Sequence, residues 1–99
     1  MLETFTLSTF LPHVHQSFQI QGGSSVLDTE LVEAKAIGIE FSNRRAPFTL
    51  LFRAAYPPVW IQNTYTVIHP ALGSFELFLV PVGPDPKSPG GMLYEAVFS

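Results

Sequence analysis

The chain has 99 residues, a net charge of −3 and no cysteine, so we expect one domain, residues 1–99, without disulfides or thiolate metal sites. Only two of the five basic residues are adjacent, which argues against the basic stripe of a nucleic-acid-binding protein. There is also no run of roughly 18 apolar residues as in a membrane helix, and no apolar N-terminal run as in a signal peptide. These features predict a cytoplasmic protein without a nucleic-acid or membrane partner.

The low charge content is itself informative. Charged residues make up 13% of the chain, about half of the roughly 25% that is typical of soluble domains. Because surface charge keeps monomers apart, this shortage indicates a surface partly covered by a partner protein or by a second copy. The alternative is a monomer whose polar surface consists of Ser, Thr, Gln and Asn.

The N-terminal region predicts a short helical turn followed by a strand. Ser8 is a candidate helix cap, and Pro12 follows at about the first turn. Residues 17–21 alternate between polar and apolar side chains, which is typical of a strand. The Gly-Gly-Ser-Ser sequence of residues 22–25 then predicts a turn.

Residues 26–37 predict a longer strand with an irregularity. The alternation slips at Leu31 and Val32, which are both apolar, so we expect a bulge or a second buried face there. A helix over residues 28–36, which Asp28 could cap, is the alternative, because β-branched residues are sparse in this run.

The middle of the chain predicts a loop, a strand and a proline-broken connection. Residues 41–47 are expected to form the loop, with Arg44 and Arg45 near its tip. Residues 48–53 predict a strand, and residues 54–63 contain two adjacent prolines that a central strand does not accept.

The C-terminal part predicts an antiparallel hairpin over residues 65–82, an exposed Pro/Gly-rich loop over 84–91 and a last strand over 92–98. Pro70 suits the second position of a type I turn, and Gly73 suits the positive φ at its exit. Together the chain reads as an all-β protein, a small antiparallel barrel or sandwich of about six strands with a short N-terminal helical turn.

The second arm of the hairpin is apolar on both sides. Phe75, Leu77 and Leu79 share one face, whereas Phe78 and Val80 share the other face with a glutamate. This composition predicts a strand covered on both faces, and a chain of this size has little material for the second covering. Pro81 further predicts a strand at a sheet edge or one leaving the sheet.

The segment 56–61 is the second candidate for an interaction surface. Its prolines stiffen it, and Trp60 is a large anchor of the kind found in interface hot spots. Equally, Trp60 could plug one end of a barrel, with Arg53 closing that end through loop carbonyls. The candidate interaction residues are Tyr56, Trp60, Ile61, Phe78 and Val80.

No motif predicts catalysis or a cofactor. His13, His15 and His69 are the only candidate metal ligands, but the spacing is weak, and we expect surface histidines together with a His69 that bonds across the hairpin turn. A serine nucleophile elbow and a phosphate-binding glycine loop are missing from the sequence. Glu30 and Glu33, two candidates for a pair of catalytic carboxylates, would fall on opposite faces of a strand. We therefore expect no enzyme activity, no cofactor and no bound metal.

Several runs of the sequence resemble a family of short bacterial proteins of unknown function. The resemblance rests on a beginning like residues 2–18, on the pattern His-Pro-x-Leu-Gly at 69–73, on Leu-Phe-Leu-Val-Pro at 77–81, and on the runs 47–53, 62–65 and 94–98. The family is associated with gene neighbourhoods that encode phage-tail-collar-like proteins, which implies an accessory or assembly role around tail-fibre-like structures. The segment 57–60 is bulkier than the family pattern.

The leading hypothesis is a non-catalytic module that self-associates or binds a larger protein through the hairpin and the Trp60 segment. The alternative is a β-barrel that holds a small ligand against the second apolar face of the hairpin.

Overall fold

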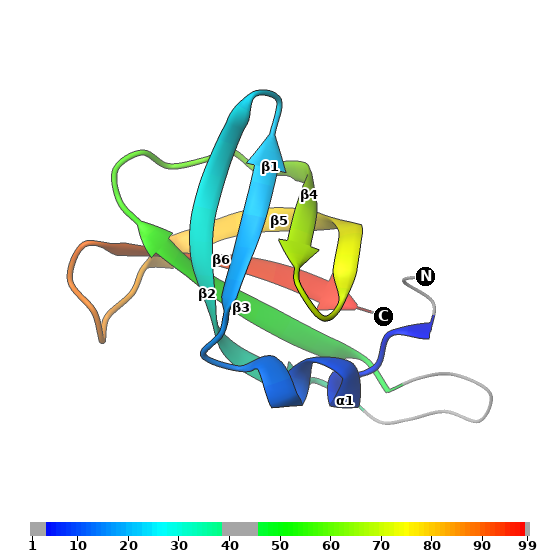
Figure 1. The fold of residues 1–99 in the computed structure, drawn as a ribbon. Helices are drawn as coiled ribbons and strands as arrows, with labels where there is room; N and C mark the ends of the chain where they lie inside the picture. The colour runs from blue at the N-terminus through cyan, green and yellow to red at the C-terminus, as the bar shows by residue number, and fades with distance from the viewer. Residues whose placement is uncertain (1–3, 39–45, 99) are drawn as a thin grey trace.

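The structure, a computed structural model, describes residues 4–38 and 46–98. Within these residues, six antiparallel strands close into a barrel in the order β1-β2-β3-β6-β5-β4 (Figure 1), which confirms the all-β expectation and selects the barrel over the sandwich. The strands are β1 (Ser17–Gly22), β2 (Ser25–Ala36), β3 (Phe48–Ala55), β4 (Asn63–His69), β5 (Gly73–Pro84) and β6 (Gly91–Phe98). The loop expected at residues 41–47 lies largely outside the described residues.

The predicted helical turn is present, but its cap is Thr6 and not Ser8. Helix α1 (Leu7–Phe10) continues into the 3-10 helix η2 (Leu11–His13), which contains the proline expected near the N-terminus. The Thr6 N–H donates to Thr9 Oγ1 at 3.0 Å, so the hydroxyl that organises the first turn stands one residue after Ser8. No helix in the described part of the chain is both long and apolar enough to cross a membrane.

Strand β2 has the predicted bulge, which rules out the helical alternative. Its pairing with β3 shifts between Leu31 and Glu33, and Val32 is the extra residue. Because the bulge resets the alternation, Glu30 and Glu33 both face the outside of the barrel, and the expectation that they lie on opposite faces is wrong.

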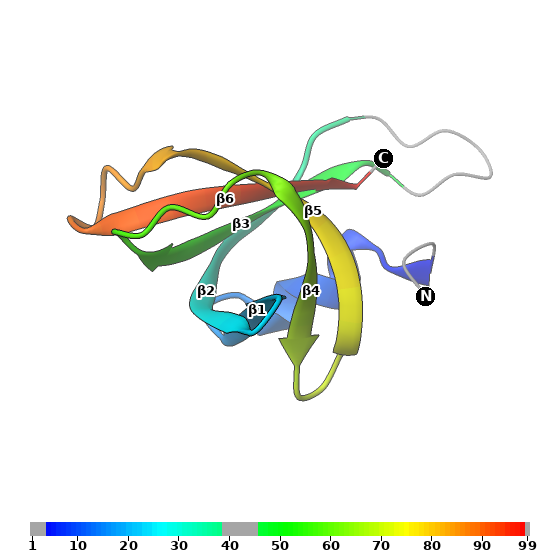
Figure 2. The ribbon, with the colours of Figure 1, turned by 90° about the horizontal axis from the view of Figure 1, so that it is seen from above.

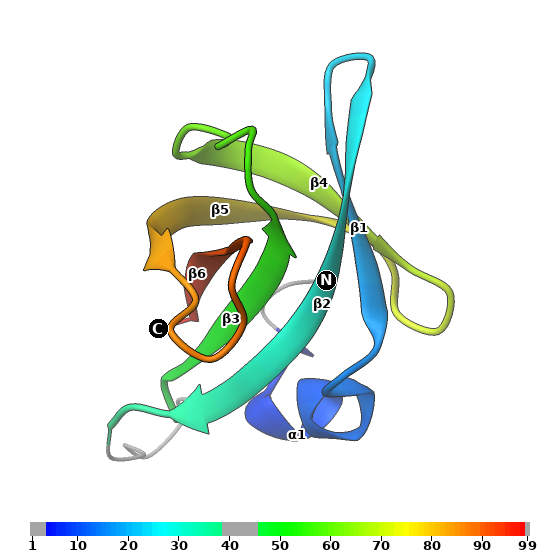
Figure 3. The ribbon, with the colours of Figure 1, turned by 90° about the vertical axis from the view of Figure 1, so that its left-hand side faces the viewer.

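The hairpin is formed by β4 and β5 as predicted, and Gly73 has the expected positive φ, +84°. Strand β5 pairs with β4 through residues 73–79 and with β6 through residues 80–84, and it curves between these partners (Figures 2 and 3). It is therefore an interior strand of a closed barrel, and the expected sheet edge is absent from the described residues. Pro81 instead precedes a register shift before Gly83, because a bulge tolerates a residue without an N–H.

The barrel interior is packed with aromatic rings. Phe18 and Phe52 meet edge to face at 5.4 Å between ring centroids, and Phe48 stacks on Phe98 at 4.5 Å. Phe10 of α1 is fully buried and lies 5.6 Å from Phe98. Helix α1 therefore adds a side chain to the core at the end of the barrel across which it lies (Figure 1).

Candidate functional site

Two features of the outer barrel wall are candidates for binding. One is a set of outward-facing apolar side chains on β5 and β6, which we call the apolar strip: Phe78, Val82 and Val97 are exposed and Val80 is half-buried. The other is a groove beside β2, β3 and β6, which we call the charged groove. Both are built by the alternation of strand residues, since each second side chain points away from the core.

The apolar strip is exposed although its strand is also part of the core. Phe75, Leu77 and Leu79 face inward and are buried, whereas Phe78 between them is 55% exposed. Val82 is exposed where the register of β5 shifts, and Val97 is exposed on β6. The expectation that β5 is covered on both faces is therefore wrong for the described chain, because no described segment packs over its outer face sufficiently to bury Phe78.

The register connects the strip to the groove. Val80 of β5 stands opposite Glu95 of β6, and Glu95 stands opposite Leu51 of β3. Leu51 in turn stands opposite Glu33 of β2. One cross-strand row therefore runs over four strands from the apolar strip to the charged groove, so the two features are parts of one continuous outer surface, which we call the outer face.

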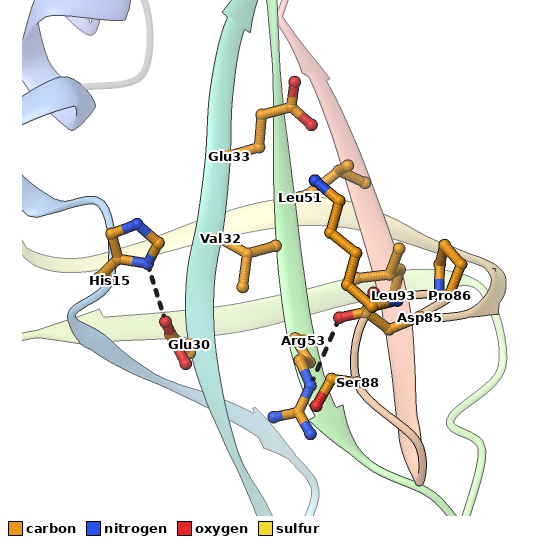
Figure 4. A pocket seen from close by; sticks show the side chains of 11 residues that line it. His15, Glu30, Val32, Glu33, Leu51, Arg53, Asp85, Pro86, Ser88 and Leu93 are labelled. Atoms are coloured by element: carbon orange, nitrogen blue, oxygen red, sulfur yellow. Dashed lines mark hydrogen bonds and ion pairs between the residues drawn. The ribbon is translucent and has the colours of Figure 1, made fainter.

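The charged groove has a volume of about 690 Å³ and an apolar floor. Val32, Leu51 and Leu93 lie between two charged edges (Figure 4). On one edge His15 Nδ1 lies 3.0 Å from Glu30 Oε2, and both side chains are well exposed. The groove thus offers apolar contact between groups of both signs.

The other edge is an ion pair that ties β3 to the loop between β5 and β6. Arg53 Nε lies 3.5 Å from Asp85 Oδ2, and the Asp85 side chain is 11% exposed. A Cβ on Gly91 would lie 2.6 Å from Arg53 Nε, so only glycine leaves room for the arginine to cross the start of β6. Arg53 was expected to bond loop carbonyls near Trp60. It instead pairs with Asp85 of the 84–91 loop. That residue is therefore largely covered, although the whole loop was expected to be exposed.

Trp60 is half-buried and packs against the core rather than standing free. Its backbone N–H donates to the Tyr94 hydroxyl at 3.0 Å, and its ring lies 5.3 Å from that of Tyr65. A Cβ on Gly22 would lie 2.8 Å from Trp60 Cζ3, so the ring rests on the end of β1. These contacts support the plug interpretation for Trp60 itself.

The neighbours of Trp60 in the same segment remain accessible. Tyr56 is 46% exposed and Ile61 is 72% exposed. Ile61 stands two residues before the start of β4, whose first residue, Asn63, pairs with Leu79. Tyr56 belongs to the other end of the segment, directly after β3.

The three histidines do not form a common site. His15 is held by Glu30 on the groove, while His13 and His69 meet at 4.5 Å between ring centroids. His69 Nδ1 accepts hydrogen bonds from the N–H groups of Ala71 and Leu72, which confirms the predicted bond across the turn. Among the described residues, no three His, Asp or Glu side chains are arranged to hold a metal ion.

The sequence analysis did not predict the charged groove, nor Val82 and Val97 of the apolar strip. The signal for Val97 is present in the alternation of residues 93–97, which places it on the same side as Glu95. The signal for the groove is the break in alternation at Leu31 and Val32. It shows that Glu33 faces outward with Glu30 only once Val32 is known to be the extra residue of the bulge. No sequence signal pairs Arg53 with Asp85, because the two are far apart along the chain.

These features define a small closed β-barrel with a packed core and an exposed apolar face. The chain belongs to the DUF6916 family, described as a domain of unknown function, which matches residues 5–98. The membership agrees with the resemblance to a family of unknown function. No curated protein and no solved structure matches the chain.

Proposed function

We propose that this protein is a non-catalytic interaction or assembly module that binds a protein partner through its outer face. The observation that carries the proposal is the exposure of Phe78 on a strand whose neighbouring residues form the core. Leaving the ring in water forgoes the free energy of burial, about 25 cal/mol for each Å² of apolar surface that stays uncovered. A partner that covers the strip recovers that free energy.

The composition of the outer face supports a protein partner. Protein interfaces combine an apolar, aromatic-containing centre with a polar rim. Here Phe78, Val80 and Val97 supply the centre, and the row through Glu95 leads to the charged groove as one side of the rim. The exposed Ile61, just before β4, is a further apolar side chain accessible to a partner.

The packed interior favours this function over ligand binding inside the barrel. Phe18, Phe52 and Tyr94 point inward and are each at most 1% exposed, and further aromatic rings fill the end next to α1. A ligand-holding barrel needs interior space of a few hundred Å³. The second apolar face of β5, which suggested such a pocket, points outward.

We extend the proposal to the class of partner. The sequence resemblance implies a role beside phage-tail-collar-like proteins, so the partner is either a second copy of this chain or a component of a tail-like assembly built in the cytoplasm. The low content of charged residues, 13%, supports association of either kind.

Sedimentation velocity over a range of protein concentrations tests self-association. We expect the wild type to form oligomers, and Phe78→Glu to sediment as a monomer, because the carboxylate would have to be buried in the contact. Gln21→Glu is the matched control, since it adds the same charge at an exposed position on β1 and should leave association unchanged.

Binding to a purified tail-collar-like protein tests the second kind of partner with the same two variants. Binding that is lost in Phe78→Glu and kept in Gln21→Glu supports the proposal. A wild type that stays monomeric at high concentration and binds no such protein contradicts it.

A further inference from the structure

We propose that His13, Gln16 and His69 form a latch that holds the N-terminal helical segment on the barrel and that opens in acid. Gln16 Oε1 accepts hydrogen bonds from both rings, from His13 Nδ1 at 2.8 Å and from His69 Nε2 at 2.7 Å. The latch therefore joins η2 to the end of β4 through one amide oxygen. None of its three residues belongs to the apolar strip or lines the charged groove.

The hydrogen bonds fix the protonation state of His69. Because an amide oxygen only accepts, the His69 nitrogen that faces Gln16, Nε2, carries a hydrogen. The other nitrogen, Nδ1, accepts from the backbone N–H groups of Ala71 and Leu72 at 3.0 and 3.3 Å and therefore carries none. His69 is thus the neutral Nε2–H tautomer in the closed latch.

A second proton on His69 is incompatible with the closed latch. It would attach to Nδ1, which accepts hydrogen bonds from two backbone N–H groups. A protonated Nδ1 is itself a donor, so these two N–H groups would lose their acceptor. The imidazolium would also be buried, since His69 is 4% exposed and its ring lies 4.5 Å from that of Phe18. Protonation therefore requires the ring to leave the turn, and this removes its bond to Gln16.

The groups around His69 strengthen this conclusion. Burial and the nearby His13 both lower the pKa of His69, burial being the larger cause. The other contacts of the ring, Gln16 just before β1 and Phe18 on β1, carry no charge. In the described part of the chain, no carboxylate is paired with His69 that would stabilise its protonated form.

The segment that the latch holds covers buried aromatic residues. Phe10 of α1 is fully buried and lies 5.9 Å from Phe48 and 5.6 Å from Phe98. The backbones of His15 and Gln16 are independently bonded to Leu31, since the His15 N–H donates to the Leu31 carbonyl at 2.6 Å and the Leu31 N–H donates to the Gln16 carbonyl at 3.1 Å. Opening therefore frees the residues before His15 and leaves β1 and β2 paired.

His15 is a fixed residue at the end of the segment that opens. It has a φ of +73°, a left-handed conformation that a non-glycine residue adopts only at a cost in free energy. Its N–H donates to the Leu31 carbonyl and its ring Nδ1 lies 3.0 Å from Glu30 Oε2, so α1 and η2 move about the residues just before His15 when the latch opens.

NMR of the full chain between pH 8 and pH 5 tests the latch. The Leu11 N–H, which bonds to the Leu7 carbonyl within the held segment, reports opening, and the Phe52 amide reports the barrel. Between the pKa of the closed latch and about 6.5, opening takes up one proton, so the Leu11 protection factor should fall about tenfold per pH unit. The protection factor of Phe52 should stay unchanged.

His69→Asn is the decisive variant. An asparagine oxygen accepts the N–H two residues on and does not titrate, so it keeps the turn and removes the acid response. Its Leu11 protection should be independent of pH in this range, while the matched control His15→Gln, at the exposed histidine, should behave like the wild type. A wild-type Leu11 response equal to that of His69→Asn would overturn the proposal.

Two further measurements keep the test decisive if His69→Asn does not fold. Gln16→Ala removes both latch bonds and should give low Leu11 protection even at pH 7.5. His13→Gln removes the neighbouring ring that helps to lower the pKa of His69, so the NMR titration of the His69 ring should move to higher pH. An unchanged ring titration together with full Leu11 protection in Gln16→Ala would contradict the latch.

Discussion

The inner and outer sides of β5 use the same kinds of residue for opposite purposes. Leu77 and Leu79 point inward and are at most 5% exposed, whereas Phe78 between them is 55% exposed. Hydrophobicity alone therefore does not tell core from surface in this strand. The difference teaches that an apolar residue is informative about binding only after the register has assigned its side.

The largest effect should come from the inner side. Leu79→Ala leaves a cavity beside fully packed aromatic rings, and we expect a loss of about 2–5 kcal/mol in the free energy of unfolding. Urea denaturation followed by circular dichroism measures this loss. A loss below about 1 kcal/mol would show that the barrel interior collapses freely and is not packed as described.

A polar contact of the inner side should matter less. Tyr94→Phe removes the hydroxyl that accepts the backbone N–H of Trp60, and we expect a loss of about 1 kcal/mol in the free energy of unfolding. The emission of Trp60, the only tryptophan, should also shift toward the red as the segment loosens. Tyr56→Phe, at an exposed tyrosine of the same segment, is the control and should change neither quantity.

Acid should weaken the inner side through His69, whose pKa is lowered by burial and by His13. The unfolded chain then binds more protons than the folded one between the folded pKa and about 6.5. The contribution of His69 to stability is fully present above about pH 6.5 and is lost as the pH falls through the folded pKa. Urea midpoints of the wild type should therefore fall over this range more than those of His69→Asn.

The smallest effect on stability should come from the outer side. Phe78→Ala should change the free energy of unfolding by less than about 1 kcal/mol, because more than half of the side chain is already in water. The same variant should weaken association in sedimentation velocity. A large loss of stability without a change in association would reverse the roles of the two sides of β5.

The sequence predicted the elements that depend on local chemistry. The hairpin followed from Pro70 and Gly73, and the bond of His69 across the turn followed from its place before Pro70. The bulge followed from two adjacent apolar residues in an alternating strand. Each of these features is determined by residues within a few positions of one another, so a single sequence contains the necessary information.

The errors share one physical cause. Glu30 and Glu33 were assigned to opposite faces because the effect of one extra residue on the alternation depends on the pairing with β3. Pro81 was assigned to an edge because only the closure of the barrel reveals β6 on its other side. Arg53 was directed to the wrong loop, because its partner Asp85 reaches it only after β3 and β6 have paired.

The sequence by itself therefore determined an all-β chain, its hairpin and the surplus of apolar residues on β5. Tertiary structure decided which of these residues are covered, since burial depends on strands that are distant along the chain. It also brought His13 and Gln16 to His69, and it joined the apolar strip to the charged groove across four strands. Local conformational preferences are encoded residue by residue, whereas surfaces and hydrogen-bond networks arise only when the barrel closes.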